Sequence, residues 1–141
     1  MTSTRASTSW DRPVRTLVAD DDDGVRDLVA LLLELEPDFD VVARARNGAE
    51  ALSLAEETEP DLVVLDVSMP VLDGLAAASG IRRFLPAAHL VMFTALTDAE
   101  LEDQARAAGA NAVLEKGAVG VQTLVQRLRA EVVRPTVNVA G

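Results

Sequence analysis

The stretch from Leu62 to Leu65 is a short run in which every side chain is apolar. Pro60 lies just before this run, and Asp66 follows it directly. A wholly apolar run of this length, bounded by residues typical of turns, indicates a strand that is buried on both faces, as in the parallel sheets of α/β proteins. The run therefore predicts a parallel sheet covered by helices, and it places one carboxylate at the carboxyl end of a strand.

Short apolar segments alternate with segments of helical periodicity along most of the chain. We expect strands at residues 15–19, 39–45, 62–65, 90–93 and 112–114. We expect five helices, the first between the acidic run and Pro37 and the others at about 47–58, 74–85, 97–109 and 121–132. Short connections in such an alternation imply right-handed crossovers, so the pattern predicts one α/β domain with a doubly wound, parallel five-stranded sheet.

The first and fourth helices carry specific local signals. Asp22 or Asp23 is expected to cap the first helix, because a short carboxylate accepts hydrogen bonds from first-turn N–H groups. The sequence from Thr97 to Glu100 has the spacing of a capping box and predicts that the fourth helix opens there. One apolar stripe of the first helix is expected to face the core, formed by Val25, Leu28, Val29, Leu32 and Leu35.

The 141 residues suit one compact domain, which we assign to residues 14–133. Residues 1–13 are rich in Ser, Thr and Arg and are expected to form a flexible N-terminal tail. Residues 134–141 lack periodicity and are expected to form a C-terminal tail or the start of a linker.

Composition narrows the range of partners. The formal net charge of -10 disfavours direct binding to nucleic acid, which depends on Lys and Arg neutralising phosphates. No apolar run approaches the roughly 18 residues that a membrane-spanning helix needs, so no membrane partner is expected. The chain has no Cys, which fits a cytoplasmic protein without disulfides.

Polar side chains follow four of the predicted strands. Asp20 and Asp21, Asp66, Thr94 and Lys116 stand at the carboxyl ends of the first, third, fourth and fifth strands. In open parallel sheets the ligand crevice lies outside these ends, so one crevice is expected to receive all of them. Carboxylates about 4 Å apart repel by roughly 4 kcal/mol per pair at an effective dielectric constant of about 20, so the group needs a cation. Hard oxygen ligands point to Mg²⁺.

This set of groups suits phosphoryl transfer to a carboxylate. Asp66 is our candidate nucleophile. A metal ion and the Lys116 ammonium would reduce repulsion between the incoming phosphate and this carboxylate, and the Thr94 hydroxyl could hydrogen-bond a phosphoryl oxygen.

These residues resemble the receiver domain of two-component response regulators. The resemblance runs from about Val14 to Val133 and implies a flavodoxin-like (βα)5 fold with strand order 2-1-3-4-5. Five motifs in the same order carry it: Leu17-Val18-Ala19-Asp20-Asp21 with Arg26 in the following helix, Leu65-Asp66-Val67-Ser68-Met69-Pro70, Asp73-Gly74, Val91-Met92-Phe93-Thr94-Ala95, and Leu114-Glu115-Lys116.

The resemblance also implies roles for the site residues. It makes Asp66 the phosphoacceptor and a direct ligand of Mg²⁺, together with Asp21 and the backbone carbonyl of Ser68. Asp20 would act on the metal through a water molecule. Lys116 would pair with the phosphoryl group or, before phosphorylation, with Asp66.

Further implications concern signalling. Thr94 would move toward the phosphoryl group and draw its loop inward. The phosphoryl donor would be a sensor histidine kinase or a phosphotransfer protein, and the domain would be a signalling module that loses the group by slow hydrolysis rather than an enzyme. A homodimer could form through the face around the fourth and fifth helices. The domain would stand alone or belong to a DNA-binding regulator. Val113 occupies a position where receivers commonly carry an aromatic residue, so the readout of the switch is expected to differ.

Two other interpretations stay open from the sequence. The stretch from Asp21 to Val25 also resembles the first motif of haloacid-dehalogenase-type phosphatases, with Asp21 as nucleophile and Asp23 as general acid. Against this stand the absence of a second acidic pair after a late strand and the lack of room for a cap domain. The other interpretation is a degenerate receiver that acts only as a protein-interaction module.

Overall fold

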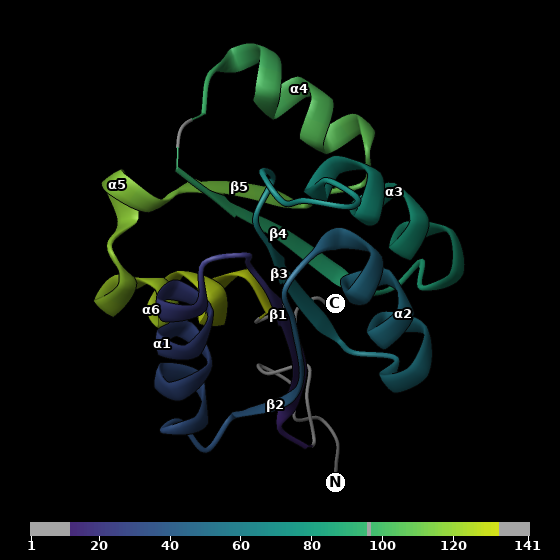
Figure 1. Ribbon diagram of the computed structural model, residues 1–141. Coiled ribbons are helices and arrows are strands. Elements are labelled where there is room, and N and C mark those ends of the chain that lie inside the picture. Colours follow the sequence, from purple (N-terminus) through teal and green to yellow (C-terminus); the bar gives the residue numbers. More distant parts are fainter. Residues whose placement is uncertain (1–11, 96, 133–141) are drawn as a thin grey trace, which may run out of the picture.

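The computed structural model describes residues 12–95 and 97–132 (Figure 1). Of the expected N-terminal tail, only Arg12 and Pro13 fall within these residues, and the expected C-terminal tail falls wholly outside them. In the part of the chain described, no helix has the length and apolar character needed to cross a membrane.

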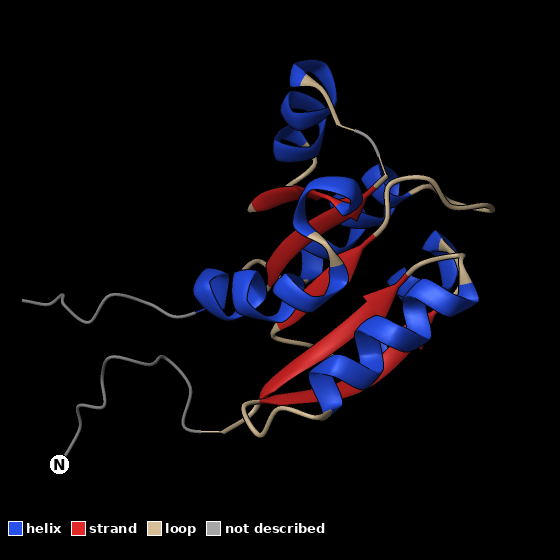
Figure 2. Cartoon of the chain, turned by 90° about the vertical axis from the view of Figure 1, so that its left-hand side faces the viewer, coloured by secondary structure: helices blue, strands red, loops and turns tan. Residues whose placement is uncertain are grey.

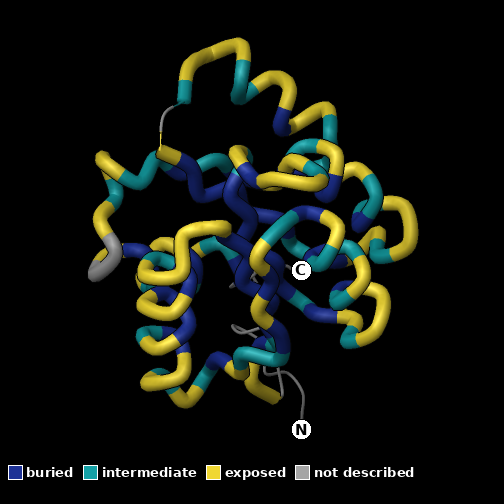
Figure 3. The backbone as a smooth tube through the Cα atoms, viewed as in Figure 1, coloured by how far each residue is buried: buried dark blue, intermediate teal, exposed yellow. Residues whose placement is uncertain are grey.

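Five strands form one parallel sheet in the order β2-β1-β3-β4-β5, which confirms the predicted order. The interior strands β1, β3 and β4 are almost wholly buried, as their apolar sequences require. Figure 3 shows these strands as the buried centre of the molecule. The strands are β1 (Val14–Ala19), β2 (Phe39–Ala45), β3 (Leu62–Leu65), β4 (His89–Thr94) and β5 (Ala112–Glu115).

Helices follow every strand, and the described residues contain six of them instead of the predicted five. The extra helix is α5, a single turn directly after β5 that ends at Gly120, whose φ of 71° lies in the left-handed region. Five helices lie close to the predicted segments. The helices are α1 (Asp23–Glu34), α2 (Gly48–Thr58), α3 (Gly74–Phe84), α4 (Ala99–Ala107), α5 (Lys116–Val119) and α6 (Val121–Val132).

Side-chain carboxylates cap α1 and α4, the two helices for which local capping signals were predicted. Asp22 caps α1 and accepts a hydrogen bond from the Val25 N–H at 3.0 Å, as one of the two predicted alternatives. The prediction for α4 was wrong by one residue: Asp98 is the cap and accepts from the Leu101 N–H at 2.8 Å. The backbone N–H of Thr97 donates instead to Oε1 of Glu115, at 3.3 Å.

The sheet separates two layers of helices (Figure 2). Side chains of α1 and α6 share one buried cluster with one face of the sheet, whereas α2, α3 and α4 share another cluster with the opposite face. Fully buried leucines contribute on both sides, among them Leu33 and Leu128 in the first cluster and Leu17 and Leu65 in the second. This is the two-sided cover that the wholly apolar run of β3 predicted.

The buried stripe of α1 differs from the predicted one. Val29 and Leu33 are buried as part of the core, but Leu28 and Leu35 are 43% and 67% exposed. Residues 28–33 are all apolar, so periodicity alone cannot tell which side of the helix faces the sheet. As a result α1 presents leucines to solvent, at Leu28, Leu31 and Leu35.

Candidate functional site

Two neighbouring strands bring the first carboxylates together. β1 and β3 are paired in parallel with Ala19 opposite Leu65, so Asp20 and Asp66 leave the sheet side by side. The Asp66 N–H donates to the Ala19 carbonyl at 3.0 Å, which continues the ladder to the site itself. The site therefore lies where the topology predicts it, outside the carboxyl ends of adjacent parallel strands.

Asp20, Asp21 and Asp66 form a compact acidic cluster. Each offers a carboxylate oxygen, and these oxygens all lie within 4.8 Å of one another. Asp20 and Asp66 are only 3% and 6% exposed, whereas the Asp21 side of the cluster is exposed to solvent. Three hard oxygen donors with one open side fit a divalent cation such as Mg²⁺.

Lys116 reaches this cluster from the end of β5. Its Nζ lies 2.7 Å from Asp20 Oδ2 and 3.4 Å from Asp66 Oδ2, and it stands 5.7 Å from the centroid of the Phe93 ring. The resemblance led us to expect a pairing with Asp66. The structure has that contact, but the shorter one is to Asp20.

The charges of the site remain out of balance. Burial raises the pKa of Asp66 above its ordinary value, the charge of Asp20 raises it further, and Lys116 only partly opposes this. Burial alone would lower the pKa of Lys116, but its hydrogen bond to Asp20 and the charges of both carboxylates outweigh burial, so the pKa is raised. One lysine thus fails to satisfy the carboxylates fully, and the site favours a further positive charge.

Two other predicted site residues are Ser68, on the loop after Asp66, and Thr94, the last residue of β4. The Ser68 N–H is 3.4 Å from Asp66 Oδ1. Thr94 ends β4 and is 4% exposed. Within residues 12–95 and 97–132, no side chain or backbone group hydrogen-bonds the Thr94 hydroxyl. A buried hydroxyl without a partner is uncommon, because the lost hydration is not replaced.

A glycine holds the third helix against Asp66. A Cβ added to Gly74 would lie 2.0 Å from the Asp66 carbonyl oxygen, which no side chain could tolerate. Asp73 caps α3 by accepting from the Ala76 N–H at 2.9 Å, and the Gly74 N–H donates to the Val67 carbonyl at 2.8 Å. A helix from residue 74 was predicted, but the close approach of Gly74 to the Asp66 carbonyl was not.

The remaining residues of the acidic run do not join the cluster. Asp22 is occupied as the cap of α1. Asp23 forms an ion pair with Arg26 at 2.7 Å, and its side chain is 79% exposed. The phosphatase alternative requires Asp23 as a general acid beside Asp21, and this ion pair with Arg26 disfavours that role.

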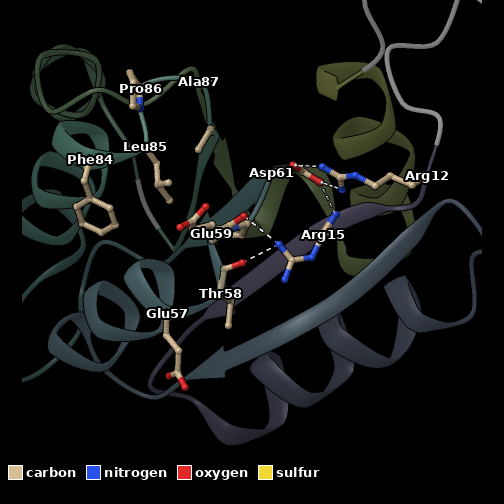
Figure 4. Close-up of a pocket in the computed structure, with 12 residues that line it drawn as sticks. Arg12, Arg15, Glu57, Thr58, Glu59, Asp61, Phe84, Leu85, Pro86 and Ala87 are labelled. Atoms are coloured by element: carbon tan, nitrogen blue, oxygen red, sulfur yellow. Dashed lines mark hydrogen bonds and ion pairs between the residues drawn. The ribbon is translucent and has the colours of Figure 1, made fainter.

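A separate hollow lies at the opposite end of the sheet (Figure 4). It has a volume of about 520 Å³ and is lined by the segment before β1, the end of α2 and the end of α3. Arg12 binds Asp61 through two hydrogen bonds of 2.7 and 3.1 Å, and Arg15 Nη1 donates to the carbonyls of Thr58 and Glu59. Figure 4 shows Phe84 on the other side of this hollow. None of the predicted site residues lines it.

Comparison with known proteins decides the family. A model of the response regulator receiver domain matches residues 16–129 of the chain. The chain belongs to this family. As a receiver, it is a phosphoacceptor module of two-component signalling rather than an enzyme.

Individual relatives agree with this assignment. The transcriptional regulatory protein LnrK of Bacillus subtilis is 40% identical over 103 residues, which are 73% of this chain and 47% of that protein. The chemotaxis protein CheY of Halobacterium salinarum is 37% identical over 102 residues, which are 72% of this chain and 83% of that protein. The receiver thus spans about half of LnrK and most of CheY.

Among solved structures, the CheX–CheY–BeF3–Mg²⁺ complex from Borrelia burgdorferi matches the fold with a TM-score of 0.80. Its sequence is 26% identical, and the match covers 87% of this chain and 92% of that chain. That relative was therefore solved with Mg²⁺ and with a protein partner.

Proposed function

We propose that Asp66 accepts the phosphoryl group. The observation that carries this proposal is its position: a buried carboxylate at the carboxyl end of β3, inside an acidic cluster and 3.4 Å from the Lys116 ammonium. The raised pKa of Asp66 is compatible with this role, because a carboxylate partly removed from water is less well solvated and therefore more reactive. A bound cation would favour its ionised form and reduce its repulsion with the incoming phosphoryl group.

The same residues would hold a metal ion. Asp21, Asp66 and the Ser68 carbonyl would bind Mg²⁺, and Asp20 would contact it through water. When bound, Mg²⁺ supplies the positive charge that lets a phosphoryl group approach a carboxylate. The fit rests on the three oxygens within 4.8 Å and on the unbalanced charge of the site. The Mg²⁺ in the related CheY complex supports it.

The transfer itself is a displacement at phosphorus. An Asp66 oxygen forms the new O–P bond while the N–P bond of a donor phosphohistidine breaks, and the electron pair of that bond stays on the histidine nitrogen. Lys116 would balance the charge on the phosphoryl oxygens. Thr94 carries a buried hydroxyl without a partner among the described residues, and a phosphoryl oxygen would supply one.

The donor would be a sensor histidine kinase or a phosphotransfer protein in the cytoplasm. α1 begins two residues after Asp21 and presents Leu28, Leu31 and Leu35 to solvent. These leucines lie at i, i+3 and i+7 and therefore share one side of the helix. An apolar stripe on a helix that begins beside the site would suit an apolar helix of the donor and would bring its phosphohistidine toward Asp66.

The output lies in the elements after Thr94 and Lys116. Movement of Thr94 toward a phosphoryl oxygen would shift the segment before α4, and the face formed by α4, β5 and α6 could support a homodimer. Val113 lies half-buried in β5 against the core, so the usual aromatic readout would be replaced by a change in packing around an aliphatic side chain. The relative LnrK is a transcriptional regulatory protein, and this receiver could serve a DNA-binding regulator in the same way or act alone.

Incubation with Mg²⁺ and acetyl phosphate, followed by intact mass measurement, tests the proposal. The parent protein is expected to gain one phosphoryl group, and Asp66→Asn is expected to gain none. Omitting Mg²⁺ should suppress the gain in the parent. The proposal fails if the parent stays unmodified, or if Asp66→Asn is modified equally well.

A further inference from the structure

Arg26 is a buried cation next to the acidic cluster, and the proposed chemistry gives it no task. It lies on the first turn of α1 and is only 9% exposed. Arginine is seldom buried to this degree without a specific set of acceptors. The residues that receive its hydrogen bonds are therefore informative.

The Arg26 guanidinium joins both ends of the loop that carries the acidic residues. Its Nη1 donates to the backbone carbonyl of Asp20 at 3.2 Å, a buried hydrogen bond. Its Nη2 donates to Asp23 Oδ1 at 2.7 Å. The planar fork of a guanidinium can hold a carbonyl and a carboxylate at once in fixed directions, which a lysine ammonium on a flexible chain cannot do.

The carbonyl that Arg26 holds belongs to the peptide unit between Asp20 and Asp21. This unit is planar, so fixing its oxygen also fixes the direction in which the chain enters Asp21. The Asp20 side chain is already held, because Oδ1 accepts from the Asp22 N–H at 2.9 Å and Oδ2 accepts from Lys116 at 2.7 Å. Asp21 is exposed, and its carboxylate direction depends on the backbone of this loop.

We propose that Arg26 is a positioning residue that holds the Asp20–Asp21 peptide in the orientation needed for Mg²⁺ binding. This inference rests on the proposed metal site. The expected effect of removing Arg26 on Mg²⁺ affinity is opposite to the effect of its charge, because a nearby positive charge by itself repels Mg²⁺. If Arg26 acted only through its charge, its removal would strengthen Mg²⁺ binding; if it positions the loop, its removal weakens binding.

Mg²⁺ titration by isothermal calorimetry, without any phosphodonor, separates these cases. Arg26→Met is expected to bind Mg²⁺ about tenfold or more weakly than the parent, the effect typical of lost outer contacts to metal ligands. Arg26→Lys keeps the charge but lacks the fork, so its binding is expected to be weaker than that of the parent as well. Unfolding midpoints measured in a chelator identify which variants are folded.

Arg44→Met is the matched control. Arg26 Nε lies 3.7 Å from Asp27 Oδ1, and Arg44 contacts the same carboxylate oxygen at 3.5 Å. Arg44, however, lies on β2 and bonds Glu34 rather than the loop. Its replacement is expected to leave Mg²⁺ binding unchanged or slightly stronger. The inference is overturned if folded Arg26→Met, or folded Arg26→Lys where the Met variant does not fold, binds Mg²⁺ as tightly as the parent. Failure of the folded parent to bind Mg²⁺ would overturn the proposed metal site and this inference with it.

Discussion

The two ends of the sheet handle charge in opposite ways. At the carboxyl end, Asp20, Asp21 and Asp66 crowd their carboxylates within 4.8 Å, and Lys116 contacts two of them. At the amino end, oppositely charged groups are matched: Arg12 binds Asp61 through both of its carboxylate oxygens, and Arg15 donates to two carbonyls.

The difference separates a site built for a ligand from one built for stability. Like charges held close together in a buried place are unfavourable until a cation arrives, so the carboxyl end is ready to bind one. The hollow at the amino end is roomy, but Arg12 already binds Asp61 in the loop before β3, and Arg15 of β1 already donates to the Thr58 carbonyl at the end of α2. None of the candidate site residues lines this hollow, so the charge balance, not concave shape, points to the carboxyl end.

Removal of Lys116 should have the largest effect, a loss of phosphorylation at the carboxyl end of the sheet. Lys116→Met leaves the developing phosphoryl charge without its ammonium, so the rate of phosphorylation by acetyl phosphate is expected to fall about 100-fold. Arg127→Met, which removes an exposed cation of α6, is the control and should leave the rate unchanged. Time courses of intact mass measure both, and an unchanged rate in Lys116→Met would contradict the assigned role.

Removal of Asp61 should lower stability and leave phosphorylation unchanged. Asp61→Ala deprives the Arg15 N–H of its 2.9 Å acceptor and Arg12 of its carboxylate, so the free energy of unfolding is expected to fall by about 2 kcal/mol. The phosphorylation rate of the folded variant should stay the same. Urea unfolding checks the stability, with Asp40→Ala, at an exposed position of β2, as the control. If Asp61→Ala lost phosphorylation without losing stability, the assignment of the amino end to stability would be wrong.

Neutralising Asp66 should stabilise the protein when no metal is present. The pKa of Asp66 is raised in the folded state above its ordinary 3.8, so the folded protein binds a proton more tightly than the unfolded chain does. The free energy of unfolding therefore falls as pH rises from the ordinary value of 3.8 through the raised pKa of the folded state. In a chelator at neutral pH, Asp66→Asn is expected to be more stable than the parent by about 1 kcal/mol, the size of a typical stabilising substitution.

The pH dependence provides the check. The advantage of Asp66→Asn should shrink as pH falls toward 3.8, because Asp66 then becomes neutral in the parent too. Urea unfolding across this pH range measures it. An advantage that grows on acidification would mean that the carboxylate of Asp66 is stabilised in the folded state, contrary to our account.

The smallest effect is expected at Val71, in the loop after Asp66. Its φ is 71°, the Leu72 N–H donates to the Pro70 carbonyl at 2.7 Å, and the side chain is 80% exposed. A β-branched residue is strained in this tight turn. Val71→Gly should relieve strain and, after the greater chain entropy of Gly, stabilise the protein by about 0.5 kcal/mol. Thermal unfolding measures this; Val71→Ala, which keeps a Cβ, should gain less.

Much of the site could be predicted because topology places it. Asp20 and Asp66 follow, and Thr94 ends, short apolar runs typical of buried parallel strands, and such strands end at one edge of the sheet. The choice of Lys116 between two carboxylates could not be predicted, since it depends on sub-ångström positions that strand patterns do not encode.

The fold shows the same division. The strand order and the order of the helices along the chain could be predicted. The side of α1 that faces the sheet could not, because the apolar run from Leu28 to Leu33 fits more than one side of the helix. The single turn of α5 escaped prediction because four residues are too few to show a period. Arg26 could be recognised in the sequence as part of the first receiver motif, but its hydrogen bond to the Asp20 carbonyl could not be predicted, since it depends on the path of the backbone.

The most direct test of the account is to locate the phosphoryl group. After phosphorylation by acetyl phosphate with Mg²⁺, borohydride reduces an acyl phosphate to an alcohol, so a modified aspartate becomes homoserine. Peptide sequencing by mass spectrometry should then find homoserine at Asp66, with Asp20 and Asp21 unchanged. Homoserine at Asp21 would support the phosphatase-like alternative and contradict the assignment of Asp66 as the phosphoacceptor.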